Sequence, residues 1–176
     1  MLNTDYTVRN EIVSTDQASP EIRCMICQFV KDELDWEEVD DLLMIRNTSK
    51  LRSQIVAFTD VAKSNGVDVM IFPECSIPES LVEDLYKFAA ANDMYIIAGT
   101  HYKKSGPAYT SICPVITPQK VYEIEKINVS PFEDSPYPNK GFKGGRSTAI
   151  FRNSRIGTFA VTVCIDFMND TTRSEE

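Results

Sequence analysis

One carboxylate, one ammonium group and one thiol stand at the ends of three separate apolar stretches of this sequence. Glu74 follows the stretch 67–72, Lys126 closes the stretch 121–126, and Cys164 closes the stretch 161–164. Short apolar stretches are typical of buried strands, and residues at strand ends can meet at one edge of a sheet. A carboxylate base, a thiol nucleophile and a cation that stabilises an oxyanion would together support acyl transfer.

The thiol needs a base, because a free cysteine is mostly protonated at neutral pH. Histidine is the usual partner, and this chain contains one, His101. Glu74 is the alternative, since a partly desolvated carboxylate binds protons more tightly. Lys126 and the backbone N–H of Ile165 are candidate donors to the oxyanion. Ordinary roles also stay open, because packed thiols and solvated charges at strand ends are common.

The bulk composition is that of a single globular domain. The 176 residues are 43% hydrophobic and 25% charged, with a net charge of −8, and such a chain can bury a sizeable core. The acidic balance and the lack of a Lys/Arg-rich stripe argue against a nucleic-acid partner. Five cysteines, an odd number at low density, argue against a disulfide framework. No secretory signal or membrane-length apolar stretch is evident, so we expect a cytoplasmic protein without membrane contact.

The first hundred residues alternate strand and helix signals, which predicts an α/β layer with parallel neighbouring strands. Helices are expected in residues 48–65, capped by Thr48 or Ser49 and ended by Asn65-Gly66, and in residues 78–92. Buried strands are expected at 22–30, 67–72 and 94–99. Residues 31–47 indicate a loop with at most a short helix.

After His101 the pattern changes to strands joined by turns, with no long helix beyond residue 92. These strands are expected at 109–116, 119–126, 147–151 and 156–163. Residues 127–146, rich in proline and glycine, predict a binding loop or lid.

Three segments, in order, resemble the signature segments of the nitrilase, or carbon–nitrogen hydrolase, superfamily. They are Phe72-Pro73-Glu74, then Glu125-Lys126 with Ser130-Pro131-Phe132-Glu133, then Arg155-Ile156-Gly157 leading to Val163-Cys164-Ile165-Asp166. The similarity covers residues 22–166. It implies an α/β fold, the α-β-β-α sandwich of the nitrilase type, and hydrolysis of non-peptide C–N bonds in amides, nitriles or carbamoyl groups.

The same resemblance implies residue roles. Glu74 would be the general base, Cys164 the nucleophile and Lys126 the oxyanion stabiliser, with no metal and no organic cofactor. Glu133 matches a second glutamate that orients the lysine and the substrate, although it follows Lys126 by seven residues and the family's spacing is one residue longer. Ile165 would position the substrate through its backbone N–H.

Where the family often carries His-Leu after the lysine, this chain has Asn128-Val129. Only twelve residues follow Cys164, whereas a nitrilase domain continues with further strands and helices.

The predicted domain organisation follows from the extent of the resemblance and from the short segment after Cys164. Residues 1–20 are expected to be a flexible polar segment, and residues 21–176 a nitrilase-like domain that is incomplete after the nucleophile strand. The expected partners are a small-molecule amide or nitrile substrate and a second copy or another protein that covers the incomplete sheet. The competing hypothesis is a catalytically inactive nitrilase-like binding or regulatory domain of a larger protein or assembly.

Overall fold

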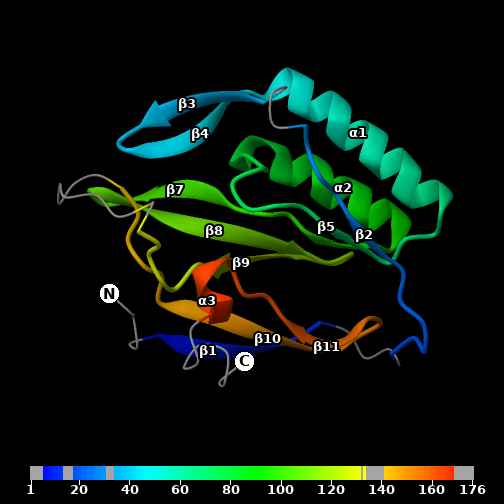
Figure 1. The fold of residues 1–176 in the computed structure, drawn as a ribbon. Coiled ribbons are helices and arrows are strands. Elements are labelled where there is room, and N and C mark those ends of the chain that lie inside the picture. The colour runs from blue at the N-terminus through cyan, green and yellow to red at the C-terminus, as the bar shows by residue number, and fades with distance from the viewer. Residues whose placement is uncertain (1–5, 14–17, 31–33, 132, 134–140, 169–176) are drawn as a thin grey trace.

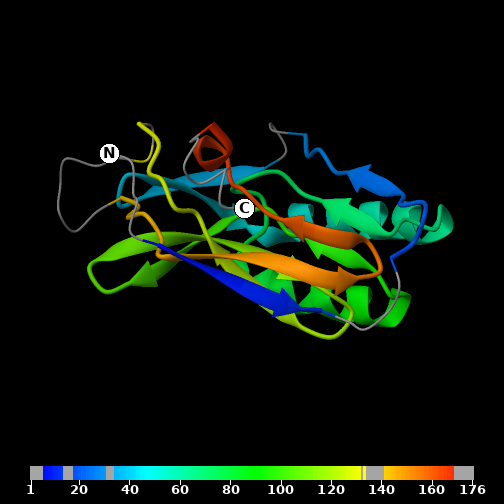
Figure 2. The same cartoon turned by 90° about the horizontal axis from the view of Figure 1, so that it is seen from below.

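The computed structural model describes residues 6–13, 18–30, 34–131, 133 and 141–168. These residues form a layered α/β sandwich (Figure 1). Helices α1 (Thr48–Ser64) and α2 (Val82–Asn92) cover one face of a six-stranded sheet, and a three-stranded sheet packs against its other face. Figures 1 and 2 show both long helices on the same side. Within the described residues, three of the four predicted layers are therefore present.

The six-stranded sheet contains the strand ends that carry two of the predicted site residues. Its strands are β2 (Cys24–Ile26), β5 (Val69–Ile71), β6 (Tyr95–Ile97), β7 (His101–Ser105), β8 (Ala108–Ile116) and β9 (Val121–Glu125). They are ordered β2-β5-β6-β8-β7, with β9 paired to β8 as well. The β2, β5 and β6 strands run parallel, which confirms the parallel neighbours predicted for the first hundred residues.

The second sheet differs from the sequence prediction at the N-terminus. Strand β1 (Thr7–Ile12) pairs in parallel with β10 (Ser147–Ser154), which pairs antiparallel with β11 (Gly157–Ala160). The prediction of a flexible segment is therefore wrong for the residues of β1. The polar stretch forms a strand because a partner far along the chain satisfies its backbone hydrogen bonds, and periodicity in one segment cannot reveal that partner. Residues 1–5, 14–17 and 169–176 lie outside the described residues.

A β-hairpin occupies the segment predicted to be a loop. Strands β3 (Asp35–Val39) and β4 (Leu42–Asn47) pair antiparallel and are joined by Asp40 and Asp41, both with positive φ, 51° and 67°. Positive φ at both central residues is the requirement of a two-residue type I′ turn, for which Asn-Gly is the usual signal. Because this turn lacks glycine, the sequence does not indicate a hairpin here.

The helices lie where the sequence predicts them, although Thr48 and Ser49, the predicted caps of the first helix, are not its N-cap, and the first strand departs from the prediction. The N-cap of α1 is Asn47, whose side chain accepts a hydrogen bond from the Ser49 backbone N–H, and Asn65 is the C-cap. A 3₁₀ turn, η2 (Glu79–Leu81), precedes α2. A strand forms within the predicted segment 22–30, but β2 is short and lies at the sheet edge with Cys24 and Ile26 exposed, so the predicted length and burial are wrong.

After α2, the described chain contains only one further α-helix, α3 (Ile165–Met168), of four residues, in agreement with the prediction of no long helix. The described residues of the segment 127–146 lie outside every helix and strand of the fold. Residues 132 and 134–140 of the predicted loop lie outside the described residues.

Candidate active site

A cavity of about 540 Å³ opens where the loop after β5, the end of β9 and the turn after β11 converge. The β3–β4 hairpin forms its remaining wall. Its lining residues are Trp36, Asp41, Leu42, Leu43, Glu74, Cys75, Tyr102, Lys126, Ser130, Glu133 and Cys164. Four of the five residues predicted for the site, all except Ile165, therefore line one cavity.

Lys126 is the most deeply buried of these groups, with a side chain 1% exposed. Its Nζ lies 2.8 Å from Glu74 Oε1 and 2.6 Å from Glu133 Oε2. Burial alone would lower the pKa of Lys126, but the hydrogen bonds and charges of Glu133 and Glu74 outweigh burial and raise it. The ammonium therefore stays charged and is fixed between two carboxylates.

Glu133 is held from several sides although its place in the sequence differs by one from the family spacing. Oε2 accepts hydrogen bonds from the Ser130 backbone N–H at 3.2 Å and from Ser130 Oγ at 2.7 Å. Tyr102 donates its hydroxyl to Oε1 at 3.0 Å. Burial would raise the pKa of Glu133, but Lys126 and Ser130 lower it overall. Tyr102 is a site residue that the sequence did not reveal, since strand β7 was not predicted.

Cys164 stands in a turn with φ 53° between β11 and α3 and is exposed at the cavity. Partial desolvation is the main reason that its pKa is raised, and the charge and hydrogen bond of Glu74 add to this, against the lowering effects of Lys126 and of the Ile165 backbone N–H. At neutral pH the group is thus a thiol with a carboxylate beside it. The Ile165 N–H points to Cys164 Sγ, and Ile165 is the one predicted site residue that does not line the cavity.

Asp166 connects the Cys164 turn to the segment that follows Lys126. Its buried carboxylate accepts hydrogen bonds from the backbone N–H groups of Ile127 at 2.9 Å and Asn128 at 2.7 Å, and from Asn128 Nδ2 at 2.9 Å. The sequence contained a signal for this residue, because Asp166 belongs to the third segment that resembles the family.

The loop that carries Glu74 packs closely against the link between β6 and β7. Gly99 has φ 67°, and a Cβ at this position would collide with the carbonyl oxygen of Pro73. The Cys75 backbone N–H donates to Thr100 Oγ1 at 2.8 Å. The glycine therefore permits the approach that places Glu74 at the cavity.

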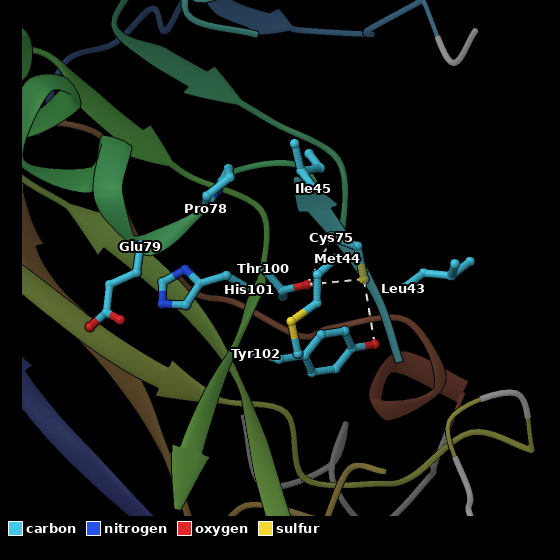
Figure 3. Close-up of a pocket in the computed structure, with 9 residues that line it drawn as sticks. All are labelled: Leu43, Met44, Ile45, Cys75, Pro78, Glu79, Thr100, His101 and Tyr102. Carbon is cyan, nitrogen blue, oxygen red and sulfur yellow. Dashed lines mark hydrogen bonds between the residues drawn. The ribbon is translucent and has the colours of Figure 1, made fainter. Parts of the chain in front are cut away.

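His101 is placed apart from Cys164. It is buried, its Nδ1 lies 3.1 Å from the Ile77 carbonyl oxygen, and burial lowers the pKa of its imidazole. It lines a smaller chamber of about 120 Å³ (Figure 3), which Cys164 does not line. The geometry consequently favours Glu74 over His101 as the base for Cys164.

Two other features are absent from the part of the chain that the structure describes. No group of three His, Cys, Asp or Glu side chains there could hold a metal ion. None of the described helices combines the length and apolar character needed to cross a bilayer.

The sandwich has counterparts among solved structures. The NitN amidase from Nesterenkonia sp. AN1 matches with a TM-score of 0.56 and 14% identity, over 83% of this chain and 58% of that chain. Nit3 from Saccharomyces cerevisiae, a member of branch 10 of the nitrilase superfamily, matches with a TM-score of 0.57 and 13% identity, over 80% of this chain and 56% of that chain. The predicted nitrilase-type fold is thereby confirmed, and this chain spans less than two thirds of the length of these neighbours.

A mutant of the Nesterenkonia amidase shows the result of Michael addition of acrylamide at its active-site cysteine; it matches with a TM-score of 0.55 and 12% identity, over 83% of this chain and 58% of that chain. No protein-family model matches the sequence, and no curated protein matches it significantly. The similarity is thus one of fold.

Proposed function

We propose that this chain hydrolyses a non-peptide carbon–nitrogen bond of a small molecule, of the amide, nitrile or carbamoyl type, through a thioester on Cys164. The observation that supports this most directly is that Lys126 Nζ joins Glu74 and Glu133 in the cavity that Cys164 also lines. A fold neighbour, a mutant amidase whose active-site cysteine undergoes Michael addition to acrylamide, supports a nucleophilic cysteine in this fold.

For an amide substrate, acylation begins when Glu74 takes the proton of Cys164 Sγ. The thiolate adds to the carbonyl carbon, a C–S bond forms, and the carbonyl electron pair moves to oxygen. Lys126 Nζ and the Ile165 backbone N–H stabilise this oxyanion. Glu74 then gives its proton to the substrate nitrogen, the C–N bond breaks, and the amine or ammonia leaves a thioester on Cys164.

Deacylation reverses the proton transfers with water as the nucleophile. Glu74 takes a proton from the water, whose oxygen attacks the thioester carbon. The C–S bond breaks, the carboxylic acid leaves, and Glu74 returns its proton to the Cys164 sulfur. Every step uses side chains and backbone groups of this chain, and no cofactor is invoked.

Glu133 acts in this scheme as a positioning residue. Its bond to Lys126 keeps the ammonium charged and directed into the cavity, and Tyr102 and Ser130 fix the carboxylate itself. Because the carboxylate already accepts these bonds, it would orient the lysine rather than exchange protons with the substrate.

Two substitutions test the proposal on a panel of small amides, ureas and nitriles. Cys164→Ala should lower kcat by about 10⁴-fold or more, and Glu74→Gln by roughly 10²- to 10⁴-fold. Cys24→Ala is the matched control, because Cys24 is an exposed thiol on β2 away from the cavity. Full turnover in both site variants would rule out this mechanism. Loss of turnover in His101→Ala alone would indicate a hydrolase in which His101, and not Glu74, is the base for Cys164.

The competing hypothesis is a binding or regulatory domain without turnover, and the observation that favours it is the altered segment after Lys126, where Asn128-Val129 replace the His-Leu that the family often carries. Labelling with iodoacetamide and peptide mass spectrometry separates the two. Selective labelling of Cys164 over Cys24 and Cys75 supports an activated thiol, and labelling in proportion to exposure supports the binding role.

A further inference from the structure

We propose that the β3–β4 hairpin is the wall that selects the acyl group, and that it favours amides with an uncharged, apolar acyl group over amides that carry a carboxylate. This inference rests on the function proposed for the same cavity and names its substrate class. It follows from the side chains of the hairpin, from its anchoring and from the charges around the cavity.

The hairpin contributes three large apolar side chains to the lining of the cavity. Trp36 from β3 and Leu42 and Leu43 from β4 line it. Leu43 is 60% exposed, so its side chain has apolar surface that a ligand can cover. Covering such surface is favourable for an alkyl or aryl group and gives nothing to a charged one.

The hairpin is anchored at its turn, which gives this wall a defined position. Tyr109 donates its hydroxyl to Asp40 Oδ2 at 3.1 Å, and the Gly141 backbone N–H donates to the Asp40 carbonyl oxygen at 2.9 Å. Leu42 packs with Tyr109 and Phe142 in a small buried cluster. A wall fixed in this way can discriminate by shape.

The charges around the cavity disfavour an anionic acyl group. Among the described residues that line it, Lys126 is the only cation, and both Glu74 and Glu133 already bind it. Asp41 at the hairpin turn adds a further carboxylate to the lining. A carboxylate on the substrate would lose water and meet like charges without gaining a cation of its own.

The smaller chamber adjoins this cavity. Leu43, Cys75 and Tyr102 line both cavities. Figure 3 shows Cys75 at this boundary, with its sulfur between the hydroxyls of Thr100 and Tyr102, and the contacts are 3.7 and 3.6 Å. Met44, Ile45 and Pro78 also line the chamber, beside the polar side chains of Glu79, Thr100 and His101, so an alkyl chain longer than an acetyl group finds apolar surface on one part of it.

The test measures binding of a matched pair of amides, hexanamide and the monoamide of adipic acid, to the Cys164→Ala chain by calorimetry. The two have the same chain length and differ in the terminal carboxylate. Hexanamide should bind at least roughly tenfold more tightly. Because Cys164→Ala removes the nucleophile, the preference is read without turnover, so a failure of the hydrolase proposal is seen separately as absent hydrolysis by the unmodified chain.

Variants in the same background assign the preference to the hairpin. Trp36→Ala and Leu43→Ala should each weaken hexanamide binding, by roughly tenfold for the larger side chain, and Asp41→Asn should strengthen binding of the anionic amide alone. Glu38→Ala, an exposed hairpin residue outside the cavity lining, is the control and should change neither. Leu43→Ala guards against misfolding in Trp36→Ala, because Leu43 is largely exposed. Equal affinities, no binding of either amide, or unchanged binding in both apolar variants would overturn the inference.

Discussion

Asp166 Oδ1 accepts two hydrogen bonds from Asn128, one from the backbone N–H at 2.7 Å and one from the side-chain amide at 2.9 Å. This contact joins the turn that carries Cys164 to the segment that follows Lys126 in the sequence. It also gives a structural reason for asparagine at a position where the family often carries histidine. The position of Cys164 relative to Lys126 thus depends on a buried carboxylate that takes no part in the proposed chemistry.

Replacing that carboxylate should loosen the site. Asp166→Asn would turn a side-chain amide toward backbone donors, and we expect a loss of about 2–3 kcal/mol in the free energy of unfolding. Urea denaturation measures it, and hydrogen exchange at Ile127 and Asn128 should speed up. Asp60→Asn, on the exposed face of α1, is the control and should change stability by less than about 0.5 kcal/mol. Matching values for the two variants would show that Asp166 is not an anchor.

The reactivity of Cys164 should depend on the charge of Glu74. Burial raises the pKa of Cys164 and the negative charge of Glu74 raises it further, while Lys126 lowers it. Glu74→Gln removes one raising influence, so the thiolate should form at lower pH and alkylation by iodoacetamide at pH 7 should be faster. The pH profile of the labelling rate, followed by mass spectrometry, tests this. A profile that moves to higher pH would contradict the assigned contact.

The ion pair of Lys126 with Glu133 should stabilise the fold. Its two side chains are 1% and 10% exposed, so Glu133→Gln leaves a buried ammonium with one partner fewer and should cost about 3 kcal/mol at neutral pH. Because the folded pKa of Glu133 is lowered, its contribution is present above the pKa of the unfolded chain and is lost as the pH falls through the folded pKa. The difference between wild type and variant should therefore shrink in acid.

An exposed pair on α2 supplies the control for this measurement. Glu83 and Lys87 lie 3.5 Å apart with side chains 67% and 68% exposed. Glu83→Gln should cost no more than about 0.5 kcal/mol. Denaturation curves of both variants at pH 7 and pH 4 complete the comparison, and a pH-independent cost for Glu133→Gln would be inconsistent with the lowered pKa.

Close packing at Gly99 should be required for both stability and activity. Gly99→Ala adds a Cβ against the Pro73 carbonyl oxygen at φ 67°. We expect the free energy of unfolding to fall by about 3 kcal/mol and Glu74 to be displaced. Gly106→Ala is the matched control, because Gly106 has φ 64° and open space around its Cα. It should cost only about 1 kcal/mol, from backbone strain. Similar losses for the two would mean that the contact with Pro73 does not matter.

Local patterns in the sequence were sufficient for most elements of the main sheet and its helix layer. Apolar stretches and helical spacing identified α1, α2, β5, β6, β8 and β9. Each of these elements buries one face, and the spacing of its own apolar residues shows which face that is. The order of the segments around Glu74, Lys126 and Cys164 identified the cavity residues. Asn65 ended α1 as the composition indicated.

Tertiary structure alone decided the rest. Strand β1 exists because β10 pairs with it, and the β3–β4 hairpin turns at two aspartates with positive φ, of which Asp40 is held by hydrogen bonds from Tyr109 and Gly141. The hydrogen-bond and ion-pair partners of Glu133, Tyr102 and Asp166 come within reach only when distant strand ends meet in the fold. Residue types and spacing therefore determined which groups could do chemistry, whereas pairing and packing between distant segments decided which of those groups face one another, because hydrogen bonds and ion pairs depend on distances that sequence order does not contain.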